Sequence, residues 1–551
     1  MRGDSFVQLA QAEQLKKYEI PAERGRIYLR ETASAEGRVP VVLNENRPTL
    51  YADPRYVQDP LATAQAIAGV LGGSVSDYQD SLSDQERFYV VLAKKLSRAK
   101  AAAIAELKLD GIGLQDYSAR SYPEGDLAAQ VLGFVNDEGA GQYGIEGALD
   151  EELQGDAGLL RAVTDVRGIP LTTSEDAILK DPVDGDDLVL TIDRGIQSYV
   201  QDALERGVRS SKAKSGSVVV MDPNTGAVLA MANFPSFKPA EFGKAKDPAL
   251  FVNGVVSIPY EVGSVAKPFT MAAGLNEGSI SPGDTYSDPG YAMVDGIKID
   301  NASGVPSGNH TMTEVIQQSV NSGVVHVLKQ LSGGQAINQS GRDKLYQYFN
   351  ERFGFAQPTG IEQAAEASGV LIDPGDPEGN NVRYANMTFG QGMSLTMLQM
   401  ASAFCALVNG GDYYQPYLVH ARVDRLSGEE VTTQPKVLRG DIISRRTSDQ
   451  LQSMMERVVQ AGGGISARRD GYKVGGKTGT SQKLDVNGNY SDFLETGSFI
   501  GYGAGDEPQY VIMVKIDEPG IYGYAGSVAA APVFAEVSNF LIDHFRIAPV
   551  R

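Results

Sequence analysis

The stretch Glu261-Val-Gly-Ser-Val-Ala-Lys-Pro-Phe-Thr270 places a hydroxyl and an amine three residues apart. If this stretch is helical, Ser264 and Lys267 lie on one face, because residues i and i+3 are neighbours on a helix surface. A serine hydroxyl is a weak nucleophile, and a lysine amine can activate it when burial and nearby positive charge keep that amine neutral. The pair suffices for acyl transfer, although most Ser-x-x-Lys sequences are ordinary helix surface.

Two further motifs follow in the same half of the chain. Ser319 and Asn321 offer a hydroxyl for proton relay and an amide that could hold a substrate carbonyl. The stretch Val474-Gly-Gly-Lys-Thr-Gly-Thr-Ser481 has a strand-like pattern and combines a cation, two hydroxyls and glycine. Its Lys477, Thr478 and Thr480 suit a carboxylate, and Gly479 lets a ligand approach the backbone.

The third motif has an alternative interpretation as a phosphate loop. Gly471, Gly476, Lys477 and Thr478 formally satisfy Gly-x-x-x-x-Gly-Lys-[Ser/Thr]. A phosphate loop should follow an apolar strand and open a helix, whereas Ser466-Ala-Arg-Arg-Asp470 precedes this segment and turn-rich residues 485–489 follow it. The flanking sequence disfavours nucleotide binding without excluding it.

Composition narrows the class of protein. The 551 residues carry 49 Lys and Arg against 69 Asp and Glu, a net charge of −20, which disfavours a nucleic-acid partner. The single cysteine, Cys405, cannot form an internal disulfide, and the four histidines lack the spacing of metal ligands, so we expect no metal and no cofactor. No run approaches the roughly 18 apolar residues of a membrane span. Residues 6–15 begin a helical pattern without a capped start, which favours a longer natural chain.

The chain length and a change of composition predict two domains, residues 1–180 and 181–551, divided at the Asp-, Pro- and Gly-rich stretch 181–187. The first mixes short strands with a helical stretch at about 82–107. In the second we expect helices at 194–209 and 531–544, a hairpin at 218–231, helical segments at 264–350 and 394–409, and neighbouring strands at 498–502 and 510–516. Strands at both ends around a helical middle predict an α+β fold with one antiparallel sheet.

Ser-x-x-Lys, then Ser-x-Asn, then Lys-Thr-Gly, in that order, is typical of penicillin-binding proteins and their β-lactamase relatives. The chain resembles a class B penicillin-binding protein, the monofunctional transpeptidase family, over nearly its whole length. Further landmarks of the resemblance are Ile20–Ile27, Arg120–Gly125, Gly141–Glu146, Pro235–Phe237, Gly390–Gly392, Asn409–Gly411 and Asp517–Pro519. One departure is Val262, where the family usually has proline.

The resemblance implies a penicillin-binding transpeptidase fold on an elongated, non-catalytic N-terminal pedestal domain of the dimerisation type. It also implies peptidoglycan cross-linking through a serine acyl-enzyme, and covalent binding of β-lactams. By the same resemblance, the expected roles are nucleophile for Ser264, base for Lys267, relay for Ser319, substrate binding for Asn321, Lys477, Thr478, Gly479 and Thr480, and a backbone oxyanion hole at Ser264 and Thr480.

Partners and location follow from the same resemblance. The expected partners are peptidoglycan stem peptides, β-lactam antibiotics and a SEDS-type glycan polymerase in the membrane. The family carries a single membrane anchor before a segment like residues 2–14, so we expect an anchored, extracytoplasmic enzyme. A D,D-carboxypeptidase or β-lactamase and a non-catalytic β-lactam sensor or scaffold are the alternatives.

Overall fold

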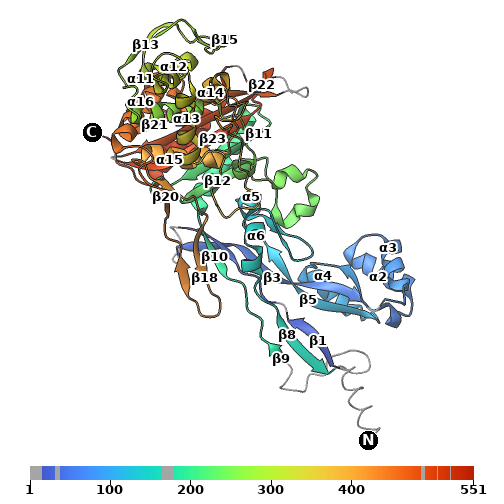
Figure 1. Ribbon diagram of the computed structural model, residues 1–551. Coiled ribbons are helices and arrows are strands. Elements are labelled where there is room, and N and C mark those ends of the chain that lie inside the picture. Colours follow the sequence, from blue (N-terminus) through green and yellow to red (C-terminus); the bar gives the residue numbers. More distant parts are fainter. Residues whose placement is uncertain are drawn as a thin grey trace.

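The computed structural model describes residues 15–20, 22–31, 37–87, 89–163, 178–484, 490–505, 507–521 and 523–550. Figure 1 shows an elongated molecule, with the N-terminal strands and helices extending as an arm from a larger C-terminal part. The expected helical pattern at residues 6–15 falls outside the described residues, except that Leu15 begins strand β1 (Leu15–Ile20).

The arm is built on two sheets. One has the order β1-β8-β9, and the other the order β19-β18-β10-β2-β3-β4, with β5 also paired to β3. Their bounds are β2 Ile27–Arg30, β3 Arg38–Ala52, β4 Val90–Ala93, β5 Ile112–Ser121, β8 Gly158–Val163, β9 Ile178–Lys180, β10 Asp187–Asp193, β18 Val419–Val423 and β19 Glu430–Thr432. Between β5 and β8 lie α5 Ala129–Leu132, β6 Phe134–Val135, β7 Gly141–Gln142, α6 Gly144–Ala148 and α7 Asp150–Gln154.

The predicted helical stretch at 82–107 is only partly helical. Helix α3 (Val75–Ser83) ends near its start, strand β4 pairs with β3, and α4 (Arg98–Glu106) begins only after Ser97, whose hydroxyl accepts from the Lys100 amide. The run Val90–Ala93 suits a strand, and tertiary pairing decides its conformation. With α2 (Pro60–Leu71), these helices enclose a small core around Leu50, Ile67 and Ile104.

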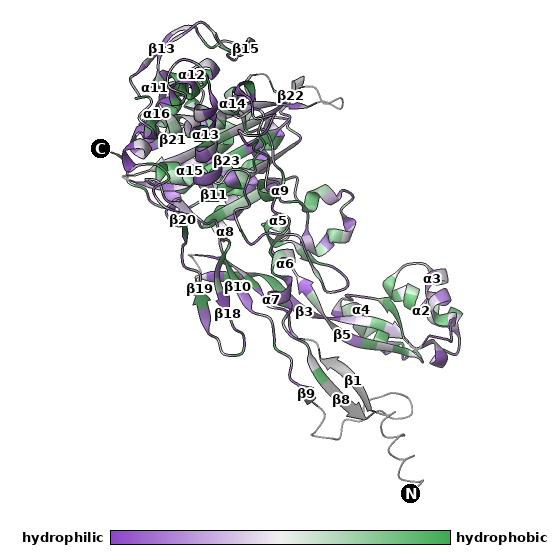
Figure 2. Ribbon diagram, in the orientation of Figure 1, coloured by the Kyte–Doolittle hydropathy of each residue, from purple (hydrophilic) through white to green (hydrophobic). Residues whose placement is uncertain are grey.

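The predicted antiparallel sheet is confirmed in the C-terminal part. Its order is β12-β11-β23-β22-β21, with bounds β11 Ser215–Met221, β12 Val228–Phe234, β21 Lys473–Leu484, β22 Tyr490–Ala504 and β23 Pro508–Asp517. Alternation along β11 divides two cores: Val218 and Val220 pack with α8 (Arg194–Ser210) and α17 (Ala531–His544), whereas Val219 and Met221 join the larger core. Figure 2 shows hydrophobic residues along short helices near the sheet, such as α5 and α9 (Gly254–Ser257).

The larger core is made mainly by helices. Their bounds are α9 Gly254–Ser257, α10 Lys267–Asn276, α11 Met312–Gln317, α12 Asn321–Leu331, α13 Gln339–Tyr346, α14 Asn381–Met387, α15 Met397–Val408 and α16 Arg445–Ala461. The expected helical segments of 264–350 lie on both sides of residues 285–311, which form strands instead. Two strand pairs occupy that segment, β13 (Thr285–Asp288) with β16 (Gly308–Thr311), and β14 (Tyr291–Val294) with β15 (Ile297–Asp300). We call residues 285–311 the flap.

A tight turn explains the inner hairpin of the flap. Asp295 and Gly296 connect β14 to β15, and both have positive φ, 48° and 80°. An Asp-Gly pair with positive φ at both positions is a strong two-residue hairpin signal. The Asp295-Gly296 pair was visible in the sequence, but the helical patterns on either side of it led us to expect helical segments in this range.

The domain boundary at residue 180 stays a prediction. Strand β10 begins just beyond it and pairs in parallel with β2 of the arm and antiparallel with β18, which comes from residues 419–423. The arm sheet therefore contains chain from both sides of the predicted boundary.

Candidate functional site

Ser264 and Lys267 lie at the start of one helix. Residues Gly263–Ala266 form a 3₁₀ turn that continues into α10, whose first residue is Lys267. Gly263 has φ of +63°, and a Cβ there would lie 2.9 Å from the Thr480 carbonyl oxygen. Glycine thus lets the turn before Ser264 approach strand β21 closely. Val262, the departure from the family pattern, is buried with φ of −74°, so proline and valine fit the same backbone.

The Lys267 amine is fully buried and points at Ser319. Its Nζ donates to the Ser319 carbonyl oxygen at 2.5 Å and to the Ser319 hydroxyl at 3.0 Å. Burial, and second the charge of Lys477, hold the pKa of Lys267 well below its usual value. The structure thus surrounds this amine with what a neutral, proton-accepting lysine requires.

Ser319 lies in the bend between α11 and α12, with φ of +62°. A non-glycine residue in this region is uncommon, and the surrounding contacts must hold it there. Asn321 begins α12 and donates its side-chain amide to the Asp300 carbonyl in the flap, at 3.1 Å. Both motif residues are therefore fixed by backbone geometry or by a contact with the flap.

Lys477 approaches Ser319 from the opposite side. It belongs to β21, the last strand of the sheet, and its Nζ donates to the Ser319 hydroxyl at 3.0 Å and to the Thr478 carbonyl at 3.1 Å. Burial lowers the pKa of Lys477 to about 7. The Ser319 oxygen thus lies between two lysine nitrogens, each at 3.0 Å, and could pass a proton between groups on either side.

These elements enclose a cavity of about 880 Å³. Five predicted site residues line it: Ser264, Ser319, Asn321, Thr478 and Thr480. The two lysines lie behind them, as does Gly479, where a Cβ would lie 2.4 Å from the Ser498 hydroxyl. The structure therefore brings all predicted site residues together, and their individual roles stay predictions.

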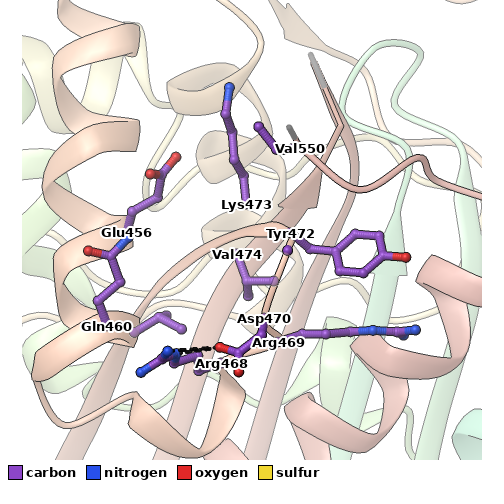
Figure 3. Close-up of a pocket in the computed structure, with 11 residues that line it drawn as sticks. Glu456, Gln460, Arg468, Arg469, Asp470, Tyr472, Lys473, Val474 and Val550 are labelled. Atoms are coloured by element: carbon purple, nitrogen blue, oxygen red, sulfur yellow. Dashed lines mark hydrogen bonds and ion pairs between the residues drawn. The ribbon is translucent and has the colours of Figure 1, made fainter.

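The phosphate-loop alternative was wrong. Residues 473–484 are one continuous strand, not a loop that opens a helix, and the Lys477 amine is directed to Ser319. A separate hollow of about 430 Å³ is lined by Lys473 together with Glu456 and Gln460 of α16. Figure 3 shows these side chains. The candidate phosphate-loop lysine does not line this hollow.

Several cavity residues were missed by sequence reasoning. Flap residues 297–306 form one wall, and across the opening the Tyr524 hydroxyl donates to the Ser303 carbonyl. Gln391 and Glu495 also line the cavity. Gly390–Gly392 was noted as a family landmark, and the structure gives a reason: a Cβ on Gly390 would lie 2.1 Å from the Gly263 carbonyl oxygen. The other residues had no motif to mark them.

Comparisons with known proteins show which families and relatives the chain is similar to. The penicillin-binding protein transpeptidase domain model matches residues 216–539, and the penicillin-binding protein dimerisation domain model matches residues 19–190. Stage V sporulation protein D of Bacillus subtilis is 32% identical, over 99% of this chain and 82% of its own length. The probable peptidoglycan D,D-transpeptidase PenA of Neisseria gonorrhoeae is 28% identical, over 100% of this chain and 88% of its own length.

Solved structures give the same result. Penicillin-binding protein 3 of Mycobacterium tuberculosis, in its apo form, is similar with a TM-score of 0.72 and 26% identity, over 97% of this chain and 98% of that one. Other crystal structures of that protein contain aztreonam or ampicillin.

Proposed function

This chain belongs to the class B penicillin-binding proteins and is a peptidoglycan D,D-transpeptidase, and from that premise we propose that it acts through an acyl-enzyme on Ser264. The observation that supports this most is the buried amine of Lys267, with its lowered pKa, one helical turn from Ser264. A lysine of this kind can take the serine proton, because burial lowers its pKa and so favours the neutral form that a base requires.

In the proposed reaction, the Ser264 hydroxyl attacks the carbonyl between the two terminal D-alanines of a stem peptide. Its proton passes to Lys267, and Ser319, within 3.0 Å of both lysine amines, relays a proton to the leaving amine. D-Alanine leaves and an ester remains on Ser264. An amine from a second strand then attacks the ester, forms the cross-link and returns the hydroxyl.

Binding groups surround this path. Thr478 and Thr480 face the cavity beside Lys477 and would hold the terminal carboxylate. Asn321 would orient the peptide amide, which requires its side chain to exchange or share its contact with Asp300. The backbone amides of Ser264 and Thr480 would form the oxyanion hole, where one donor contributes on the order of 3 kcal/mol to the transition state. The close approach of Gly263 to Thr480 supports this pairing.

A β-lactam would acylate the same serine, because its strained amide resembles the D-alanyl-D-alanine end. Its leaving group stays tethered, so the ester should persist. The complexes of Mycobacterium tuberculosis penicillin-binding protein 3 with aztreonam and ampicillin support this part of the proposal.

Location and the membrane partner also belong to the proposal. Within the described ranges, no helix has both the length and the apolar character needed to cross a membrane. We place the catalytic part outside the cytoplasm, because its substrate is the cell wall, and propose that the protein is anchored to the membrane. The arm would serve as a pedestal that contacts a SEDS-type glycan polymerase.

Intact-protein mass after incubation with benzylpenicillin tests the proposal. We expect one adduct per chain on the parent and none on Ser264→Ala. Circular dichroism of both proteins controls for folding. Absence of the adduct from a folded parent, or its persistence in Ser264→Ala, would overturn the serine mechanism.

A further inference from the structure

The arm contains a hollow that is separate from the catalytic cavity and has no role in the proposed reaction. Its volume is about 620 Å³, and it is lined by residues of strand β3 and by the first residue of helix α4, both labelled in Figure 1. All seven lining residues are polar or charged: Glu23, Arg26, Asn44, Glu45, Asn46, Arg47 and Arg98. An apolar ligand gains little in such a hollow, because the hydrophobic effect requires apolar surface to bury.

Three arginines on separate segments give the hollow a positive character that the whole chain lacks. Arg26 precedes β2, Arg47 lies on β3, and Arg98 begins α4. The chain carries a net charge of −20, whereas the lining has three arginines against two glutamates. A local excess of positive charge attracts anions that the rest of the surface repels.

The two glutamates of the lining already have partners. Glu23 contacts Arg425 of the β18–β19 hairpin at 2.7 Å. Glu45 accepts from the Ser121 hydroxyl at 2.8 Å and contacts Arg47 at 2.6 Å, and these bonds lower the pKa of its carboxyl. Neither carboxylate is therefore left to neutralise the other two arginines.

Arg26 and Arg98 keep donors that a ligand can use. Among the residues that the structure describes, no ion pair joins either guanidinium to a carboxylate. A hydrogen bond with the Tyr28 hydroxyl raises the pKa of Arg26, and burial opposes this only in part. Arg98 is exposed at the first position of α4. A guanidinium has five N–H donors in a planar fork, which matches the oxygens of a phosphate or a carboxylate.

The segment before α4 extends this positive region. Residues 94–100 have the sequence Lys-Lys-Leu-Ser-Arg-Ala-Lys, and all four of their cationic side chains are exposed. Lys95 pairs with Asp137 at 3.0 Å, and Lys100 donates to the Leu71 carbonyl at 3.2 Å. The hollow itself is far larger than one phosphate group, since a water molecule takes only about 30 Å³. Cations spread along a hollow of this size suit an anion with several charged groups rather than a single ion.

We propose that this hollow binds a water-soluble polyanion with successive phosphate groups, and that Arg26 and Arg98 are its main contacts. Phosphate groups have more acceptor oxygens than carboxylates, which suits guanidinium forks on different walls. A soluble ligand is favoured over a membrane, because the lining offers no apolar side chain to insert into lipid. It is favoured over a nucleic acid, because the lining offers no aromatic ring to stack on a base.

This inference goes beyond the proposed function and does not rest on it. None of the seven residues that line the hollow also lines the catalytic cavity. Binding in the arm can therefore be measured whether or not Ser264 is the nucleophile.

Isothermal titration calorimetry with sodium tripolyphosphate as the probe tests the proposal. We expect the parent to bind one tripolyphosphate per chain, with an affinity that falls as salt rises. Arg98→Gln should weaken binding at least about tenfold, because it removes an exposed cation and its donors. Arg98→Lys should weaken it by about threefold, since lysine keeps the charge but lacks the planar fork.

Arg55→Gln is the matched control. Arg55 is another exposed arginine of the arm, it pairs with Asp53 at 2.7 Å, and it does not line the hollow. Its loss should leave the affinity for tripolyphosphate within about twofold of the parent value. Circular dichroism of each variant controls for folding.

The other results would each overturn the proposal. Equal weakening in Arg98→Gln and Arg55→Gln would show that only the overall charge matters. Citrate that binds as tightly as tripolyphosphate would overturn the choice of phosphate. A folded parent that does not bind tripolyphosphate would overturn the site, and binding of phosphatidylglycerol vesicles in its place would assign the hollow to a membrane surface. Penicillin labelling should be equal in the parent and Arg98→Gln, so a failure of the serine mechanism would appear separately.

Discussion

At the scale of single residues, the site depends on two buried lysines with different pKa values. Lys477 has a pKa of about 7, and burial is the cause. Lys267 has a pKa well below its usual value, through burial and the charge of Lys477. In the proposed function, protonated Lys477 would attract the carboxylate of a ligand and, through its charge, keep Lys267 neutral.

This arrangement predicts an alkaline limb in the pH dependence of acylation. As pH rises through about 7, Lys477 loses its proton in the free enzyme and its attraction for the benzylpenicillin carboxylate disappears. The second-order rate constant should therefore fall by about tenfold per pH unit well above that pKa. Stopped-flow measurement between pH 5.5 and about 9, with circular dichroism at each pH, checks it. A flat profile over this range would contradict the charged role of Lys477.

Gly390 gives a second prediction at this scale. It has φ of +85°, and a Cβ would lie 2.1 Å from the carbonyl oxygen of Gly263, which precedes the proposed nucleophile Ser264. Gly390→Ala should lower the free energy of unfolding by about 1–3 kcal/mol and slow acylation by benzylpenicillin at least about tenfold. Gly243→Ala is the control, because nothing lies within 4 Å of its Cβ position. Equal acylation rates in the two variants would show that this contact does not position Ser264.

The residues of the three motifs could be predicted from the sequence because their chemistry and order are distinctive together. Glu495 could not, because a glutamate in a strand carries no signal until its pairing with Gln482 is known. Ser319 shows an intermediate case: its identity was predicted, but its positive φ, and its position between two amines, depend on tertiary contacts.

At the scale of elements, the flap supports the helix that follows Ser319. Helix α12 has no side-chain cap of its own, and Asn301 of the flap supplies one: its side-chain Oδ1 accepts from the Ser322 backbone amide at 2.9 Å. The side-chain amide nitrogen of Asn301 donates in turn to the carboxylate of the buried Asp288 at 2.7 Å. An acceptor at the second amide of a helix does the work of an N-cap, here from another element.

Removing this cap should affect both stability and acylation. Asn301→Ala is expected to lower the free energy of unfolding by about 1 kcal/mol and, by loosening α12, to slow acylation of Ser264 by benzylpenicillin about fivefold or more. Asn338→Ala is matched, since Asn338 caps α13 through Gly341 at 3.1 Å and does not line the cavity. Chemical denaturation and stopped-flow acylation measure the two effects. Equal rates of acylation in both variants would show that the flap stabilises the fold but does not affect the reaction at Ser264.

Element types were predicted where periodicity and end signals agreed. Helices α8 and α17 and strands β11, β12, β22 and β23 lie close to their expected positions. The flap and β4 were missed for one physical reason. Their strands are each four residues long in helix-like surroundings, and pairing partners, which the local sequence does not show, stabilise them.

At the scale of the whole molecule, the arm and the catalytic part share a sheet. The hairpin β18–β19, from residues 419–432, adds to the arm sheet beside β10, and Arg425 in its loop contacts Glu23 at 2.7 Å. Arg422 pairs with Glu152 of α7 at 2.6 Å. Dividing the sequence at one boundary could not predict that this hairpin joins the arm sheet, because the hairpin lies more than two hundred residues beyond the predicted boundary.

A buried ionic cluster in the arm allows the contribution of the arm to the stability of the molecule to be tested separately. The Glu146 side chain is fully buried and contacts Arg24 at 2.6 Å and Arg120 at 2.7 Å. Glu146→Gln would leave two guanidinium groups without their shared counter-charge, and we expect about 3 kcal/mol of lost stability in the arm. Glu45→Gln is the control, since its partner Arg47 is exposed and such pairs contribute at most about 1 kcal/mol.

Scanning calorimetry with benzylpenicillin labelling distinguishes two forms of coupling. If the arm unfolds separately, Glu146→Gln should lower the temperature of one transition only, and Ser264 should still be labelled between that transition and the next. If the shared sheet makes the parts one cooperative unit, a single transition should shift and labelling should end with it. We expect the second outcome, because strands from both parts lie in one sheet and β10 pairs with β2 across the predicted boundary. Two separate transitions would contradict it and would make the arm an independently folding support.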